Sequence, residues 1–140
     1  MITNNIHGTC VAFGRAGVLI RGSSGSGKSD LALRLIDNKA KLVSDDQVLD
    51  MEKNGKIVLS APRSIAGKIE VRGVGIMDMQ YTKSSTLALI VDLVDKGEVI
   101  ERLPKKKFTR LLGVKVPVIE LSSFESSALA KLKLALKNIL

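Results

Sequence analysis

Residues 22–29 read Gly-Ser-Ser-Gly-Ser-Gly-Lys-Ser, a full match to the phosphate-binding loop pattern G-x-x-x-x-G-K-S, called the P-loop. Glycines allow successive backbone N–H groups to turn inward around a phosphate. In this pattern the lysine adds positive charge near the outer phosphates, and the serine hydroxyl is placed to hold Mg²⁺. The loop expected to bind nucleotide phosphate consists of Gly22, Ser23, Ser24, Gly25, Ser26, Gly27, Lys28 and Ser29.

The segments on either side of the loop are those that a P-loop requires. Residues 16–21 form a short β-prone run that leads directly into the glycines. From Lys28 onward, apolar residues recur at helical spacing, and Asn38 offers a stop. Strand, glycine-rich loop and helix in this order place the helix dipole at the phosphate. A flexible Ser/Gly linker would need neither the Lys-Ser pair nor the apolar flanks.

The composition is that of one compact domain, and we expect residues 1–140 to fold as a single unit. The chain has 140 residues, of which 45% are hydrophobic. No run is long and apolar enough to span a membrane, so no membrane association is expected. The single cysteine, Cys10, cannot form an internal disulfide and lies in an apolar run. We therefore expect it to be buried, and a cytoplasmic location is the simplest interpretation.

The net charge of +8 is compatible with nucleic acid, an acidic protein or a small anion as partner. The chain has no Trp, one Tyr and three Phe, so side chains on which bases stack are scarce, and no nucleic-acid partner is expected. The densest basic run, Lys105-Lys106-Lys107 with Arg110, is either a solvated helix face or a docking patch.

The pattern along the chain predicts an α/β fold with a mixed sheet. Asn54-Gly55 between two apolar runs is a strong hairpin signal. Pro117 places its strand at a sheet edge, and Ser122-x-x-Glu125 is a capping-box pattern that opens the last helix. That helix carries an apolar stripe of Leu129, Leu132, Leu136, Ile139 and Leu140. Strands are expected at 7–13 after a short polar tail, and at 16–21, 41–44, 48–51, 56–61, 69–72, 76–79, 86–94 and 114–121, with a helix at 105–112.

Asp45-Asp46 is the first candidate for chemistry beyond phosphate binding. The pair ends the predicted strand 41–44, which follows the P-loop helix, and a β-α-β crossover would bring this strand alongside the first one. Its carboxyl end would then face the crevice where open α/β sheets bind ligands. One carboxylate could orient a water on Mg²⁺ while the other takes a proton from an attacking hydroxyl. Asp is also common in turns, which is the simpler alternative.

Three further polar residues attract less attention by themselves. His7 is the only histidine. Glu70 and Arg72 alternate with Ile69 and Val71, so both are expected on one face of their strand. They are either a plain cross-strand pair or a metal ligand and a phosphate clamp.

Together these segments resemble the catalytic domain of HPr kinase/phosphorylase, the bacterial enzyme that phosphorylates a serine of the phosphocarrier HPr. The resemblance covers nearly all of residues 6–104. It rests on His7-Gly8, on the P-loop, on Leu-Val-Ser-Asp-Asp at 42–46, on Ala-Pro at 61–62, on Glu-Val-Arg-Gly-Val-Gly-Ile-Met-Asp at 70–78 and on Glu-Arg-Leu at 101–103.

The resemblance implies a P-loop kinase domain of the HPr kinase and phosphoenolpyruvate carboxykinase-like type, with ATP and Mg²⁺ as cofactors and an HPr-type phosphocarrier as partner. Lys28 would bind phosphate, Ser29 and Glu70 would hold the metal, and His7 and Arg102 would lie in the active site. Arg72, with Lys28, would offset developing charge. One Asp would be the base that deprotonates the serine; we favour Asp46, with Asp45 nearer the metal. The family also implies a homo-oligomer, a hexamer.

The chain departs from the family in two places. The N-terminal domain of its long members is expected to be absent, because His7 stands almost at the start, as in the short branch of the family. The later P-V-x-x-G-R segment, tied to reverse phosphorolysis, is replaced by Pro-Val-Ile-Glu-Leu at 117–121. The kinase half is therefore the expected activity, and reverse phosphorolysis is left open. The alternatives are a P-loop NTPase or small-molecule kinase, and a non-catalytic nucleotide-sensing module.

Overall fold

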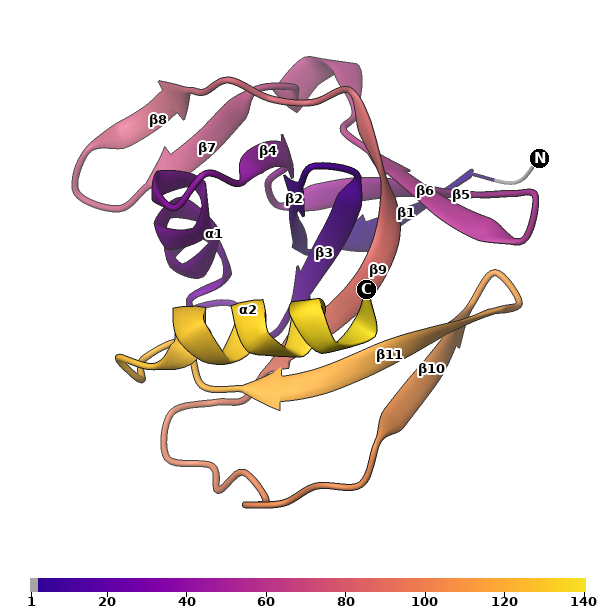
Figure 1. Ribbon diagram of the computed structural model, residues 1–140. Coiled ribbons are helices and arrows are strands. Elements are labelled where there is room, and N and C mark those ends of the chain that lie inside the picture. The colour runs from indigo at the N-terminus through magenta and orange to yellow at the C-terminus, as the bar shows by residue number, and fades with distance from the viewer. Residues whose placement is uncertain (1–2) are drawn as a thin grey trace.

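The computed structural model describes residues 3–140, which form one strongly bent mixed sheet with two helices (Figure 1). The nine-stranded sheet has β9 near its centre, and β7 and β8 form a separate two-stranded hairpin. The elements are β1 Thr3–His7, β2 Thr9–Phe13, β3 Ala16–Arg21, α1 Lys28–Asp37, β4 Lys41–Ser44, β5 Gln47–Lys53, β6 Lys56–Ser60, a 3₁₀ turn Arg63–Ile65, β7 Lys68–Val71, β8 Gly75–Asp78, β9 Ser84–Leu93, β10 Lys107–Leu111, β11 Val114–Leu121 and α2 Ala128–Ile139.

The strand order places the P-loop strand in the middle of the sheet. The order is β1-β5-β6-β9-β3-β2-β4, with β11 also paired to β9 and β10 paired to β11. β3 runs parallel to β9, while β2 is antiparallel to both β3 and β4. β3 and β4 therefore run in the same direction, and their carboxyl ends reach the same edge of the sheet. The predicted mixed sheet is confirmed. The residues that follow β3 and β4, which are the P-loop and Asp45, lie at that shared edge.

The bent sheet has a hydrophobic core on each of its faces. On one face, α1 and α2 pack over β2, β3, β4 and β9, and Leu31, Leu35, Leu132 and Leu136 are buried there. The other face is closed by the curl of the sheet itself, because β5, β6 and β11 fold over the central strands. Cys10 lies on this second face with no exposed area, as expected, and burial raises the pKa of its thiol to about 12. No helix in residues 3–140 is long and apolar enough to cross a membrane.

The strands, the helix and the turn next to the P-loop motif and the Asn-Gly pair are confirmed. β3 and β4 have the predicted bounds, and α1 ends at the cap residue Asn38. Asn54 and Gly55 form the β5–β6 turn with φ of 53° and 77°, the left-handed conformation that Asn-Gly tolerates.

The helix predicted at 105–112 is wrong, because residues 107–111 form β10, which pairs with β11. The turn between them uses Leu112 and Gly113 in the left-handed region, with φ of 49° and 80°. This hairpin also corrects the predicted edge position of β11, which lies between β10 and β9. Pro117 is tolerated because the pairing of β11 with β9 begins only at Val118, and the missing N–H of the proline falls outside that ladder.

Two terminal predictions also need correction. The polar segment before His7 is β1 from Thr3 onward, antiparallel to β5, and the chain bends at Gly8 between β1 and β2. A Cβ at Gly8 would lie 2.8 Å from the Ile20 carbonyl oxygen, so only glycine fits this bend. At the other end, α2 begins at Ala128 and not at the capping box, where Ser122 and Glu125 form a backbone turn. Of the predicted stripe, Leu132 and Leu136 are buried and Leu129 is partly buried, whereas the last two members are exposed.

Asp50 on β5 is a buried carboxyl group with no hydrogen-bond partner in residues 3–140. Its side chain has no exposed area, and both of its carboxyl oxygens are unpaired. Desolvation raises the pKa of Asp50 above its ordinary value of 3.8. Ionisation of this group therefore opposes folding.

We expect the free energy of unfolding to fall as pH rises from 3.8 through the raised pKa of Asp50, because the folded chain holds this proton more tightly than the unfolded chain does. Asp50→Asn cannot ionise and should flatten this decline, measured by urea unfolding across the pH range. The exposed carboxylate Asp37, changed to Asn, is the matched control. Identical slopes for the wild type and Asp50→Asn would contradict this assignment.

Candidate active site

The P-loop connects the end of β3 to the start of α1 and has the backbone of a phosphate cradle. Gly25 and Gly27 have φ of 82° and 95°, which residues with a side chain rarely adopt. In the described part of the chain, the amides of Gly25, Gly27, Lys28 and Ser29 donate to no backbone carbonyl. Unpaired donors at a helix N-terminus attract an anion. The loop therefore fits the phosphates predicted from its sequence.

Lys28 lies folded over the loop. Its ammonium donates to the carbonyl oxygens of Gly22 and Ser23, at 2.9 and 3.0 Å, and the side chain is only 9% exposed. Because these carbonyls belong to the P-loop itself, the positive charge of Lys28 is already held at the predicted phosphate site. Exchange of the carbonyls for phosphate oxygens requires only a local turn of the side chain.

Asp45 connects three parts of the site. One carboxylate oxygen accepts the hydroxyls of Ser29, at 2.7 Å, and of Thr9, at 2.9 Å. The other accepts the backbone N–H of Glu70, at 3.1 Å. The side chain is 6% exposed, so these contacts form away from bulk water. The carboxylate of Asp45, which follows β4, therefore connects the P-loop, β2 and the β7–β8 hairpin. Thr9 carried no signal in the sequence analysis.

The route by which Asp45 reaches the P-loop differs from the prediction. β4 does not lie alongside β3, because β2 is inserted between them and pairs with both. The two strands still point the same way, and a register shift at Cys10 and Val11 of β2 accompanies the pairing with β4. Asp45 thus faces Ser29 across the end of an intervening strand.

Asp46 points to solvent beside His7. Its side chain is 71% exposed, and one carboxylate oxygen lies 3.3 Å from Nε2 of His7, which is 59% exposed. The backbone of Asp46 has φ of 72°, and its carbonyl accepts the amide of Gly8. This turn holds the pair at the junction of β1 and β2. Asp45 and Asp46 therefore occupy different surroundings, one enclosed beside Ser29 and one open to an incoming molecule.

The other predicted site residues, Glu70, Arg72 and Arg102, have exposed side chains. Glu70 is exposed on β7, and only its amide contacts Asp45. Arg72 follows β7 and is exposed, and Arg102 is exposed in the loop between β9 and β10. In residues 3–140 neither arginine forms a recorded hydrogen bond or ion pair with the P-loop or the aspartates. The structure thus brings together His7, Lys28, Ser29, Asp45, Asp46 and the backbone of Glu70, and leaves the two arginines free.

Several residues that support the P-loop were missed. Ser123, in the loop between β11 and α2, donates its hydroxyl to the carbonyl of Ser26, and Arg34 of α1 donates to the carbonyl of Ser123. On the other side of the loop, Ser23 donates to Asp95 at 2.5 Å. A serine in a loop carries no sequence signal for such a contact. The capping-box prediction failed at this same loop, because Ser123 is held at the P-loop and α2 starts later.

The parallel neighbour of the P-loop strand supplies a further carboxylate that the sequence analysis missed. Arg21, the last residue of β3, forms a two-pronged ion pair with Asp92 of β9, at 2.7 and 2.9 Å. Such paired bonds fix orientation as well as distance. The base of the P-loop is therefore fixed to the central strand.

Oxygen donors near the loop suit Mg²⁺. The Ser29 hydroxyl and the Asp45 carboxylate are in contact, and the Asp45 bond to the Glu70 amide brings β7 to the same place. No group of three or more His, Cys, Asp or Glu side chains with metal-site geometry occurs in residues 3–140. Mg²⁺ often uses only one or two protein carboxylates and completes its shell with waters and substrate phosphates, so this donor set fits it.

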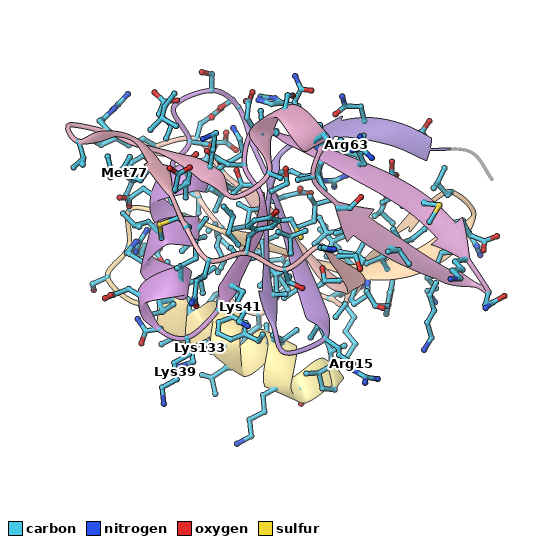
Figure 2. The ribbon with its side chains drawn as sticks, turned by 90° about the horizontal axis from the view of Figure 1, so that it is seen from above. Arg15, Lys39, Lys41, Arg63, Met77 and Lys133 are labelled. Atoms are coloured by element: carbon cyan, nitrogen blue, oxygen red, sulfur yellow. The ribbon has the colours of Figure 1, made fainter. Side chains whose placement is uncertain are left out.

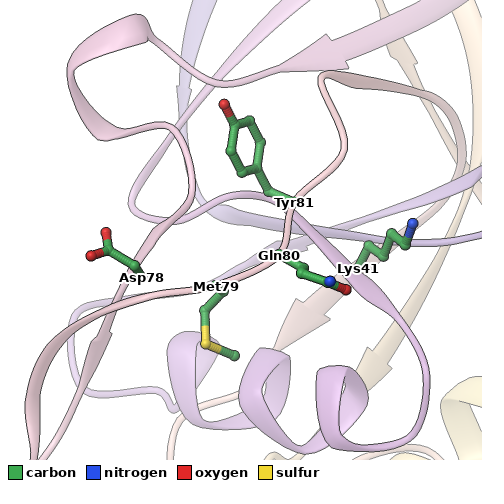
Figure 3. Close-up of a pocket in the computed structure, with 5 residues that line it drawn as sticks. All are labelled: Lys41, Asp78, Met79, Gln80 and Tyr81. Atoms are coloured by element: carbon green, nitrogen blue, oxygen red, sulfur yellow. The ribbon is translucent and has the colours of Figure 1, made fainter.

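One surface hollow lies away from this site. It has a volume of about 480 Å³ and is lined by Lys41, Asp78, Met79, Gln80 and Tyr81. Lys41 begins β4, so the hollow lies at the opposite end of that strand from Asp45. Figure 3 shows that its labelled side chains point in different directions and do not converge on one space. Binding sites need converging polar groups, so this hollow is not a candidate.

Part of the positive charge also lies away from the P-loop. In the view of Figure 2, Arg15, Lys39, Lys41 and Lys133 are all labelled toward the lower edge of the molecule. Arg15 precedes β3 and Lys41 begins β4, so both lie at the amino ends of strands whose carboxyl ends form the site. The net charge therefore does not by itself mark the phosphate site.

A P-loop with free amides, a buried carboxylate on its serine and a second, exposed carboxylate beside it define the class of P-loop phosphate-binding domains. Comparison with known proteins refines this class. The family described as HPr Serine kinase C-terminal domain matches residues 2–135. An HPr kinase/phosphorylase from Chlorobium phaeobacteroides (strain DSM 266 / SMG 266 / 2430) is 35% identical over 130 residues, covering 84% of this chain and 40% of that protein. One from Malacoplasma penetrans (strain HF-2) is 34% identical over 123 residues, covering 80% and 41%.

A solved structure, that of the HPr(Ser) kinase/phosphatase from Coxiella burnetii, matches with a TM-score of 0.85 and 26% identity. The match covers 96% of this chain and 95% of that one. The chain belongs to the HPr serine kinase C-terminal domain family. It spans about 40% of the length of the two curated relatives named above. The predicted fold class, a P-loop kinase domain with a mixed sheet, is confirmed.

Proposed function

We propose that this domain transfers the γ-phosphoryl group of ATP, with Mg²⁺, to a serine hydroxyl of an HPr-type phosphocarrier protein. The observation that carries the proposal is the position of Asp45. Its carboxylate accepts hydrogen bonds both from the hydroxyl of the P-loop residue Ser29 and from the backbone amide of Glu70 in the β7–β8 hairpin. The names of the relatives, HPr kinase/phosphorylase, support the choice of acceptor.

The donor side consists of the P-loop. Its free amides surround the phosphates, and Lys28 supplies a charge that is already held at the loop. Mg²⁺, held by Ser29 with Asp45 and Glu70 close by, would supply charge neutralisation on the phosphate oxygens. Since phosphoryl transfer depends mainly on positioning and electrostatics, these groups account for most of the catalysis.

The acceptor side consists of Asp46 and His7. Asp45 already accepts bonds on both oxygens, whereas Asp46 is open to solvent. Asp46 takes the proton of the incoming serine hydroxyl, the serine oxygen forms a bond to the γ-phosphorus, and the bond from that phosphorus to the β,γ-bridging oxygen breaks, leaving ADP. His7, 3.3 Å from Asp46, orients the carboxylate.

An acidic residue, Glu120, stands near the position where the family's segment for reverse phosphorolysis would place a cation. Glu120 is exposed near the end of β11, where its carboxylate pairs with Lys107 of β10 at 3.2 Å. An acidic group paired within its own hairpin does not favour attack by inorganic phosphate. We therefore assign the forward reaction alone.

The decisive experiment mixes the domain with γ-labelled ATP, Mg²⁺ and a purified HPr-type phosphocarrier. We expect label on the carrier, and none on a matched carrier whose acceptor serine is changed to alanine. ATP consumption with no label on the carrier would instead indicate an NTPase or small-molecule kinase. Binding of ATP with no turnover would indicate a nucleotide-sensing module, and either result would overturn the proposal.

A further inference from the structure

The loop between β11 and α2, residues 122–127, is fixed directly against the P-loop. Ser123 is 3% exposed, and its hydroxyl bonds to the carbonyl of Ser26. A Cβ added to Gly27 would overlap the Ser123 side chain, so the two loops are in close contact. Arg34 of α1 holds the carbonyl of Ser123 from the other side. The backbone that carries the next residue, Phe124, is therefore held by one contact to the P-loop and one to α1.

Phe124 presents an apolar ring to solvent at this anchored position. The ring is 56% exposed, and its Cζ atom lies 3.9 Å from the point where a Cβ on Gly27 would stand. Phe124 belongs to neither hydrophobic core. Membership of the hydrophobic cores therefore does not account for a phenylalanine at this position beside the phosphate loop.

The other aromatic residues of the chain are accounted for elsewhere. Phe13 packs against the core below α1. Phe108 on β10 is covered by the ammonium of Lys115, 4.2 Å from the ring centre. Tyr81 is bridged to Leu42 near the amino end of β4, away from Asp45. Phe124 is thus the aromatic residue that lies at the phosphate site.

We propose that the ring of Phe124 stacks on the base of the nucleotide whose phosphates the P-loop holds. The inference rests on the proposed function, which makes ATP the donor. Every nucleobase has a flat π-face, and stacking on an aromatic side chain is favourable without hydrogen-bond readout. Because the backbone at Ser123 is already fixed, little conformational freedom is lost when the base arrives. Phe124 is in this sense a positioning residue, which sets the affinity for a nucleoside triphosphate over a bare phosphate chain.

The test compares two ligands that share the phosphates and differ in the base. Dissociation constants of Mg²⁺-ATP and Mg²⁺-tripolyphosphate are measured by calorimetry for the wild type and for Phe124→Ala. We expect the dissociation constant for ATP to rise on the order of 10- to 100-fold in Phe124→Ala, and that for tripolyphosphate to stay unchanged. Unchanged tripolyphosphate binding also reports an intact P-loop. Phe124→Tyr should retain the affinity for ATP.

Phe108→Ala is the matched control, since it removes the same ring from an exposed position on β10, and it should alter neither constant. Equal ATP affinity in the wild type and Phe124→Ala would overturn the stacking role, and so would an equal loss for both ligands. A Phe124→Ala variant that binds ATP normally but requires more phosphocarrier would assign the ring to the acceptor and overturn the proposal. A wild type that binds neither ligand would contradict the proposed function itself.

Discussion

Replacing Lys28 with methionine is expected to lower phosphoryl transfer to the carrier by about 10²- to 10³-fold or more. Methionine keeps most of the length of the buried side chain and removes the charge. The ammonium, now bonded to the carbonyls of Gly22 and Ser23, is a positive charge held on the loop whose amides are free. Its loss leaves the developing charge on the transferred group without that partner. The initial rate of carrier labelling at saturating ATP measures the effect.

Lys133→Met is the matched control for this prediction. Lys133 is exposed on α2 and is labelled in Figure 2, and within residues 3–140 it forms no hydrogen bond or ion pair with the P-loop. Its loss also removes one positive charge from the chain, so a general electrostatic effect would appear in both variants. A rate for Lys28→Met within a few-fold of the wild-type rate would show that Lys28 is not part of the transfer machinery.

The parts of the site that were predictable are those encoded in contiguous sequence. The P-loop, its strand and its helix are adjacent in the chain, and their bounds follow from glycines, apolar spacing and a stop residue. The proximity of Asp45 to Ser29 was also predictable, since Ser29 lies in the first turn of α1, Asp45 directly follows β4, and a β-α-β crossover brings both to one sheet edge. What the pattern could not provide was the insertion of β2 between β3 and β4, because strand order depends on pairing energies summed over the whole sheet.

The missed contacts depend on residues far apart in the chain. Ser123 bonds to Ser26 across 97 positions, and Thr9 bonds to Asp45 across 36. Nothing in a single serine or threonine specifies such a partner. The strand β10 was missed for a related reason. A run of lysines followed by leucines has helical propensity, and pairing with β11 through the Leu112-Gly113 turn overrides it. Tertiary pairing decided this element, and local sequence did not.

Conversion of Asp46 to asparagine is expected to lower the rate of carrier phosphorylation by about 10²- to 10⁴-fold, the usual contribution of a general base, while the affinity for Mg²⁺-ATP stays unchanged. Asparagine has the same shape as aspartate and also tolerates the left-handed backbone at this residue, where φ is 72°, so the turn should persist. Single-turnover transfer and the calorimetric dissociation constant of ATP, measured on the same preparation, separate the two quantities.

Asp45→Asn provides the contrast, because its expected defect lies in binding. Asp45 accepts bonds from Ser29, Thr9 and the Glu70 amide, and asparagine offers one acceptor oxygen where the carboxylate offers two. A buried amide group that faces donors on both sides should weaken Mg²⁺-dependent ATP binding and lower the free energy of unfolding. If Asp46→Asn labelled the carrier at the wild-type rate, Asp46 would not be the base. If Asp45→Asn in addition bound ATP normally and failed only in transfer, the proton acceptor would be Asp45, and the roles of the two carboxylates would be reversed.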